Sequence, residues 1–269
     1  LLSLCEEIAT NLGFRSREKE VQLYLDYDNS VAQHYRGDVS AIRQILQNLV
    51  SNAVKFTEDG YVKLSVKVGE CCLEKRIENL ELIIEDSGIG IPADSLEVIF
   101  DKFVQADSSS TKKYSGTGLG LSICKALCGV MQGSIKVESE MGKGSRFICS
   151  LPLVKQKSTW VKPINFSDQN CLFYTQDEHL RPIVERHLKK LGIPYEVCIS
   201  LEEARVKLKP LDAEYSLVLV DYSMESIEDI QPDALNCPYL PVIVLGNSIS
   251  PYAKDPDSSP YAAWILKPF

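Results

Sequence analysis

The stretch NLVSNAVKFT, residues 48–57, lies in a segment that is predicted to form one long helix over residues 38–56. Apolar residues recur along this segment at helical spacing and give the helix one buried face. Asn48, Asn52 and Lys55 follow at i, i+4 and i+7, so they share a second, polar face. Amide oxygens can ligate a hard cation such as Mg²⁺, and a lysine one turn on can meet phosphate oxygens. Taken alone, the same stripe is also typical of a solvated helix face.

A second segment, EDSGIGIP at residues 85–92, begins at the end of an apolar stretch that is predicted to be a strand. Asp86 closes this strand, and Gly88 and Gly90 follow it. A carboxylate held there can accept a hydrogen bond from an exocyclic amine such as that of adenine, and glycines let the backbone approach the base. A strand-ending turn with a capping Asp is the alternative interpretation.

A third segment, SGTGLGLSI at residues 115–123, places Gly116, Gly118 and Gly120 around the start of a helix that begins near Leu119. Such a segment presents free backbone N–H groups and the positive end of the helix dipole to a phosphate chain. Its glycine spacing fits neither the P-loop nor the dinucleotide-binding fingerprint, so by itself it is weak evidence.

Two further segments belong to the same part of the chain. MGKGSRF contains Gly142 and Gly144, which also suit a plain hairpin turn. Phe100 and Phe103 precede a polar, Ser-rich stretch at residues 105–114, a composition expected of a lid that aromatic side chains anchor.

The order of predicted elements divides the chain into domains at residues 1–154 and 170–269, joined by a linker at residues 155–169. The chain length of 269 residues also suggests two domains, at ~150 residues each. In the first domain we predict helices over residues 1–13, 38–56, 95–103 and 119–130, strands over residues 21–28, 61–68 and 80–87, and a hairpin over residues 134–153. This pattern favours an α+β two-layer sandwich, with helices against one face of a mixed sheet.

The second domain alternates regularly between strands and helices. We predict strands over residues 171–176, 195–200, 215–224, 240–247 and 262–269, helices over residues 179–191 and 201–208, and a short helical piece ending at Leu235. Short apolar strands separated by helices predict a doubly wound, parallel α/β sheet of five strands.

Composition excludes several classes of function. A formal charge of -8 argues against a surface that coats nucleic acid or anionic lipid. No apolar run approaches the ~20 residues of a membrane span, so we expect no direct membrane insertion. The 9 cysteines are odd in number and lack a paired CxxC, which fits reduced thiols in a cytosolic compartment.

Taken together, the segments resemble the N, G1, F, G2 and G3 boxes of the catalytic ATP-binding domain of sensor histidine kinases, in order and spacing, through almost all of residues 1–153. The resemblance implies the ATP-binding sandwich of the gyrase, Hsp90, histidine kinase and MutL superfamily, with ATP and Mg²⁺ as ligands. It implies that Asn52 ligates Mg²⁺ with Asn48 assisting, that Lys55 contacts phosphate and that Asp86 holds the adenine amine. The other residues it assigns to the ATP site are Gly88, Gly90, Phe100 and Phe103 as lid anchors, and Gly116, Thr117, Gly118, Leu119 and Gly120 around the phosphates.

Asn48 distinguishes two branches of this superfamily. Relatives that hydrolyse ATP, such as gyrase, carry at this position a Glu that positions the attacking water. With an amide there, no base activates water, so the resemblance favours phosphoryl transfer to a histidine, catalysed by positioning and charge neutralisation.

The three histidines, His34, His179 and His187, do not lie in a sequence like the His-Glu-x-x-[Arg/Lys]-Thr-Pro of the family's phosphoacceptor helix. We interpret them as surface or packing residues. We therefore expect the acceptor on a dimerisation hairpin upstream of Leu1, from the same or a sister chain, so the sequence is interpreted as a piece of a longer protein.

Residues 170–269 resemble a response-regulator receiver domain, the usual attachment behind a hybrid histidine kinase. Asp221, which closes the apolar stretch SLVLVD, fits the phosphoacceptor aspartate. Lys267 in LKPF fits the lysine that senses the phosphoryl group.

The sequence differs from the receiver pattern at several positions. The position of the family's Mg²⁺-binding acidic pair reads Thr175 and Gln176, and Asp177 and Glu178 come one or two positions late. The hydroxyl residue expected after the fourth strand is replaced by Gly246. We therefore predict a pseudo-receiver that docks or regulates. A register in which the two later acids bind Mg²⁺ would instead give a true receiver.

The same residues leave two alternatives to kinase activity open. An ATPase that drives a clamp and a nucleotide-gated scaffold without kinase activity share the same boxes. Cys124 and Cys128, at i and i+4, are interpreted as helix-packing thiols, with redox sensing or a metal half-site as the alternative. For a kinase we expect a downstream receiver or phosphotransfer protein as partner, no nucleic acid, and a cytoplasmic location.

Overall fold

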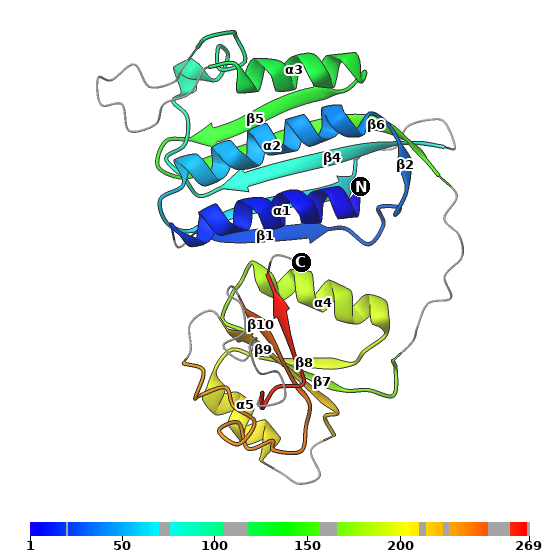
Figure 1. Cartoon of the computed structure of the whole chain (residues 1–269), viewed down its shortest axis with the longest axis vertical. Coiled ribbons are helices and arrows are strands. Elements are labelled where there is room, and N and C mark those ends of the chain that lie inside the picture. The colour runs from blue at the N-terminus through cyan, green and yellow to red at the C-terminus, as the bar shows by residue number, and fades with distance from the viewer. Residues whose placement is uncertain are drawn as a thin grey trace. The chain divides into compact units, whose positions relative to one another are not determined.

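The structure, a computed structural model, describes residues 1–19, 21–69, 76–104, 118–156, 166–209, 214–222, 226–246 and 259–267. Contacts between residues divide the chain into two compact units, Leu1–Thr159 and Trp160–Lys267 (Figure 1). Each unit is described by itself.

A mixed, six-stranded sheet forms one layer of the first unit (Figure 1). Its strands are β1 (Gln22–Tyr27), β2 (Tyr35–Arg36), β3 (Tyr61–Val68), β4 (Ile77–Asp86), β5 (Ser134–Glu140) and β6 (Gly144–Lys155). Their order is β1-β3-β4-β6-β2, and β5 pairs with β6. The pair β1–β3 is parallel, whereas the other pairs are antiparallel.

Three helices cover one face of this sheet: α1 (Leu2–Arg17), α2 (Val39–Phe56) and α3 (Gly120–Val130) (Figure 1). Helix α2 buries the apolar face that its periodicity predicts, including Ile45, Leu46 and Leu49. Its N-terminus is capped by Asp38, whose side chain accepts hydrogen bonds from the backbone N–H groups of Ser40 and Ala41. The predicted α+β sandwich is therefore confirmed.

Two predicted features of the first half differ. The helix predicted over residues 95–103 is wrong: a short 3-10 helix, η1 (Ala93–Ser95), is followed by turns. Asp101 N–H bonds back only three residues, to the Val98 carbonyl at 2.9 Å, and Phe103 has a φ of 66°, which no helix continues. Helix α1 also runs past the predicted end near Gly13. The stretch 105–114 lies outside the described residues.

The second unit contains a five-stranded, wholly parallel sheet in the order β11-β10-β9-β7-β8. Its strands are β7 (Cys171–Tyr174), β8 (Tyr195–Cys198), β9 (Leu217–Tyr222), β10 (Val242–Gly246) and β11 (Ala263–Leu266). Helices α4 (Leu180–Leu191) and α5 (Leu201–Leu208) lie on opposite sides of the sheet (Figure 1). In chain order the strands read 2-1-3-4-5, a doubly wound arrangement, which confirms the predicted parallel sheet.

The helical piece predicted before Leu235 is wrong, since the described residues 226–236 form turns. Pro232 has no backbone N–H to give to a helix, and Asn236 adopts a φ of 59°. Of the predicted linker, Lys155 still belongs to β6, and residues 157–165 lie outside the described part.

No helix among the described residues has the length and apolar character needed to cross a membrane.

The cap of α2 generates a stability prediction. Asp38→Ala removes the acceptor of two backbone N–H groups and should lower the free energy of unfolding by about 1 kcal/mol, measured by urea denaturation. Ser40→Ala is the control, because Ser40 takes part in this cap through its backbone, and it should change stability by less than about 0.5 kcal/mol. Equal losses in both variants would contradict the capping role of Asp38.

Candidate functional site

The polar stripe of α2 faces the N-terminus of α3. Asn48, Asn52 and Lys55 are half-buried on one side of α2. Asn48 Nδ2 donates to the Gly120 carbonyl at 3.3 Å. A Cβ placed on Gly120 would lie 3.8 Å from Asn48 Cγ and 4.0 Å from Asn52 Nδ2. The structure therefore brings together two segments about 70 residues apart that the sequence assigned to metal and phosphate binding.

The side chain of Asn48 has two further partners. Gln44 Nε2 donates to Asn48 Oδ1 at 3.1 Å, and Asn48 Nδ2 lies 3.8 Å from the sulfur of Cys124. Burial raises the pKa of the Cys124 thiol to about 12, so this thiol is neutral at physiological pH. Cys124 and Cys128 are both fully buried, as packing residues are, and the described residues contain no cluster of ligands that could hold a metal through them.

A lysine that sequence analysis missed fixes the end of α2. Lys19 Nζ donates to the carbonyls of Val54, Lys55 and Thr57 at 2.9, 2.8 and 3.3 Å. An ammonium group at a helix C-terminus meets the negative end of the helix dipole. Lys19 lies just after α1 and so ties α1 to the turn that carries Lys55. Its position in the sequence, far from the boxes, gives no signal of this contact.

Asp86 ends β4 beside the C-terminus of α2. It is only 7% exposed, and its Oδ1 accepts a hydrogen bond from Gly88 N–H at 2.9 Å. Burial raises the pKa of the Asp86 carboxyl, and backbone hydrogen bonds from Gly88 and Ser145 lower it by a smaller amount. A Cβ on Gly88 would lie 2.5 Å from the Phe56 carbonyl oxygen, so glycine lets the strand end approach α2.

Two other glycines bring backbone segments together, one of them at Asp86. Gly90 has a φ of 72°, and a Cβ there would lie 2.1 Å from the Glu140 carbonyl oxygen. Gly144 has a φ of 104°, and a Cβ there would lie 1.8 Å from the Asp86 carbonyl oxygen. The sequence predicts that glycines here let the backbone approach a base. In the structure, Gly90 and Gly144 also let two backbone segments approach each other closely.

The two expected lid anchors differ in their surroundings. Phe100 packs edge-on against Phe147, with ring centroids 6.5 Å apart. Phe103 is 73% exposed, and its backbone N–H donates to the Gly118 carbonyl at 3.1 Å. Gly116 and Thr117 lie outside the described residues, whereas Gly118, Leu119 and Gly120 lie at the start of α3 as predicted.

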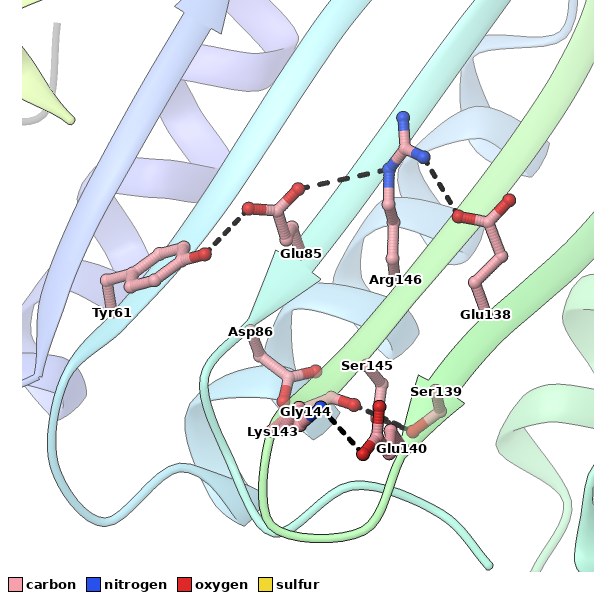
Figure 2. Close-up of a pocket in the computed structure, with 10 residues that line it drawn as sticks. All are labelled: Tyr61, Glu85, Asp86, Glu138, Ser139, Glu140, Lys143, Gly144, Ser145 and Arg146. Atoms are coloured by element: carbon pink, nitrogen blue, oxygen red, sulfur yellow. Dashed lines mark hydrogen bonds and ion pairs between the residues drawn. The ribbon is translucent and has the colours of Figure 1, made fainter. Parts of the chain in front are cut away.

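A hollow lies at the ends of β4 and β5 and the start of β6 (Figure 2), and its volume is about 390 Å³. Polar and charged side chains of its lining bind one another: Tyr61 donates to Glu85 at 2.7 Å, and Arg146 lies 3.8 Å from Glu85 and 2.9 Å from Glu138 (Figure 2). Because neighbouring residues of a strand point to opposite faces, Glu85 and Asp86 lie on different sides of the sheet. The hollow is thus a mixed-charge surface that Asp86 also lines, with four carboxyl side chains and two basic ones, Lys143 and Arg146.

In the second unit, three buried polar residues meet at the carboxyl ends of the strands. Lys267 forms an ion pair with Asp221 Oδ1, and Thr175 Oγ1 donates to Asp221 Oδ2 at 2.8 Å. Asp221 and Lys267 are each 4% exposed, and Thr175 is 1% exposed. The sequence assigns Asp221 and Lys267 to one receiver-like site, as phosphoacceptor and phosphoryl-sensing lysine. It gives no sign of the contact of Thr175, which directly follows the neighbouring strand β7.

Asp177 and Glu178, the acids that come one or two positions late in the sequence, have other surroundings. Asp177 Oδ1 accepts hydrogen bonds from the backbone N–H groups of His179 and Leu180, both at 2.9 Å, at the start of α4. Glu178 is exposed. At the position of the expected hydroxyl, a Cβ on Gly246 would lie 2.7 Å from the indole nitrogen of Trp264, so the indole fills this space.

Comparisons with known proteins identify the family to which the first unit is similar. Residues 37–155 match the family described as "Histidine kinase-, DNA gyrase B-, and HSP90-like ATPase". Hybrid signal transduction histidine kinase K of Dictyostelium discoideum is 32% identical over 244 residues, 85% of this chain and 20% of that protein. Sensor histidine kinase AruS of Pseudomonas aeruginosa is 44% identical over 147 residues, 55% of this chain and 14% of that protein.

The fold also has a solved counterpart. The crystal structure of full-length ShkA in complex with AMPPNP is similar, with a TM-score of 0.73 and 24% identity, over 98% of this chain and 52% of that one. The chain thus spans a fifth or less of the length of these two relatives. Residues 37–155 form a domain of the histidine kinase-, DNA gyrase B- and HSP90-like ATPase family, and the chain is a relative of the hybrid and sensor histidine kinases.

Proposed function

We propose that the first unit binds Mg²⁺–ATP and is the catalytic core of a hybrid histidine kinase, which transfers the γ-phosphoryl group to a histidine on upstream helices. One observation carries this proposal: the amide stripe of α2 and the N-terminus of α3 face each other across Gly120. A phosphate chain between them would meet backbone N–H groups on one side and cation-ligating amides on the other.

The residues present fit the metal. Asn48 and Asn52 are half-buried amides one helical turn apart, and their oxygens are ligands of the kind that Mg²⁺ accepts. Mg²⁺, when bound, supplies neutralisation of the phosphate charge. Lys55 would add a positive charge at the phosphate end, and the contacts of Lys19 hold the backbone of that turn.

Transfer is favoured over hydrolysis by the surroundings of Asn48. Its side-chain partners in the described part of the chain are the Gln44 amide, the Gly120 carbonyl and the Cys124 thiol. None of these groups takes a proton from water at neutral pH. The chain's residues would therefore orient the nucleotide for an external nucleophile, and positioning supplies the rate.

The adenine end of the site is assigned to Asp86. Its buried carboxylate, when ionised, would accept a hydrogen bond from the exocyclic amine of adenine. Burial away from water strengthens such a bond and makes it specific for a base that offers a donor.

For the second unit we propose a pseudo-receiver that docks or regulates. Both carboxylate oxygens of Asp221 already have protein partners, and the hydroxyl of Thr175 stands where receivers place an acid. Asp177 is engaged at the start of α4, and Trp264 fills the space beside Gly246. The partners of the whole protein would be an upstream dimerisation hairpin and a downstream receiver or phosphotransfer protein.

Gly120→Ala separates folding from binding. The added methyl makes only ordinary contacts, at 3.8 and 4.0 Å, so stability should hold or rise by up to about 1 kcal/mol. The methyl would project into the gap between Asn48 and Asn52, so Mg²⁺–ATP affinity should fall at least about tenfold by calorimetry, a loss of about 1.4 kcal/mol. Gly129→Ala, on the same helix with open space around it, is the control and should bind as wild type. Full affinity in Gly120→Ala would contradict the site.

The pH dependence of adenine binding tests Asp86. Adenosine is the probe, because it has no phosphate to titrate. Its affinity should fall as the pH drops through the raised pKa of Asp86, at a midpoint above the usual value of about 3.9 for Asp. Asp86→Asn should remove this dependence, and Glu85→Gln, on the other face of the strand, should keep it. A profile that Asp86→Asn leaves intact would show that another group titrates.

The decisive experiment is transfer of label from γ-labelled ATP in a protein that includes the upstream helices. Acid-labile, base-stable label is expected and indicates phosphohistidine. The absence of this label despite ATP binding, or steady ATP hydrolysis without it, would contradict the proposed kinase activity.

The same assay tests the second unit. Base-labile label that disappears in Asp221→Asn would make the second unit a true receiver. If the unit is a pseudo-receiver, wild type should lack base-labile label, and Thr175→Asp, which adds an acid beside Asp221, is the variant most able to gain it.

A further inference from the structure

The side-chain amide of Asn48 is held from two sides. Its Nδ2 donates to the Gly120 carbonyl at 3.3 Å and approaches the Cys124 sulfur at 3.8 Å, both on α3. Its Oδ1 accepts a hydrogen bond from Gln44 Nε2 at 3.1 Å, on α2 itself. The nitrogen of the amide therefore points to α3, and the oxygen points along α2.

This arrangement favours one orientation of the amide. An amide nitrogen carries two donor hydrogens, and here each has an acceptor on α3. If the amide turned by half a revolution, its oxygen would face the Gly120 carbonyl, and two acceptors would meet without a proton between them. The oxygen still has a second lone pair beside the one that Gln44 uses. That lone pair is the one a cation would take.

Cys124 acts in this contact as more than a packing group. Its sulfur accepts from Asn48, and its own S–H donates to the Ile45 carbonyl at 3.9 Å. The thiol thus bridges the side chain of Asn48 to the backbone of α2 less than one turn earlier. Cys124 is fully buried, so water does not replace either bond.

We propose that Cys124 is a positioning residue for the cation site: with the Gly120 carbonyl, its thiol holds the Asn48 amide so that Oδ1 is presented to Mg²⁺. This inference rests on the proposed function of Asn48 as a metal ligand. Partners of this kind, which orient a ligand without touching the metal, typically account for about 10–100-fold in metal affinity.

Cys128 offers a matched control. It is fully buried on the same helix, one turn further on, and its thiol interacts with Cys149. The same substitution at Cys124 and at Cys128 therefore removes a buried thiol in both cases, but a partner of Asn48 in only one.

The experiment measures ATP affinity by calorimetry with and without Mg²⁺, in wild type, Cys124→Val, Cys124→Ser and Cys128→Val. Valine replaces the thiol with a slightly larger apolar side chain that makes no hydrogen bonds, and serine keeps a donor and an acceptor. In Cys124→Val the gain in affinity that Mg²⁺ brings should shrink by about tenfold, with metal-free affinity unchanged. Cys124→Ser and Cys128→Val should keep the gain.

A second readout needs no nucleotide. In protein labelled with ¹⁵N-asparagine, the side-chain resonances of Asn48 are assigned by their loss in Asn48→Asp. They should shift in Cys124→Val and stay in place in Cys128→Val. If Cys124→Val does not fold, Cys124→Ala, which removes both hydrogen bonds without adding volume, replaces it.

The outcomes separate the two proposals. Equal Mg²⁺ gains in Cys124→Val and Cys128→Val, or unshifted Asn48 resonances in Cys124→Val, would overturn the positioning role and leave the ATP site intact. A wild-type protein without any Mg²⁺-dependent gain would overturn the proposed function, and the inference with it.

Discussion

The packing of α2 is the constraint on which the first unit depends. Its apolar face is buried with the core that includes Ile45, Leu46 and Leu49, and each such side chain contributes about 1.5–3 kcal/mol when removed from water. Because the helix cannot rotate without exposing these residues, its other face is fixed toward α3. The amides of Asn48 and Asn52 are thus positioned by the hydrophobic core, and Lys19 holds the turn that carries Lys55.

The rest of the first site forms where the chain approaches itself closely. Gly88, Gly90 and Gly144 each permit a backbone contact that a Cβ would block, and the contacts of Gly88 and Gly144 involve Asp86 itself. The result is a buried carboxylate beside the C-terminus of α2, with its pKa raised by burial. These glycines thus let the ends of the strands and the C-terminus of α2 lie close together.

In the second unit, the equivalent constraint is the buried pair of Asp221 and Lys267. Breaking such a pair by removing one partner typically costs about 3–5 kcal/mol, because the other charge is left uncompensated. Thr175 completes the set by donating to the second oxygen of Asp221. Both carboxylate oxygens of Asp221 therefore have partners within this buried set.

The sequence by itself determined the fold classes and the α2 stripe, since hydrophobic periodicity and residue spacing are local properties. It did not determine residues 95–103 or 226–236, where i→i+3 bonds, a proline and positive φ values outweigh apolar spacing. Nor could it give the contacts of Lys19, Cys124 or Thr175. Each of these joins segments separated along the chain, and only the packing of helices and strands decides which side chains meet.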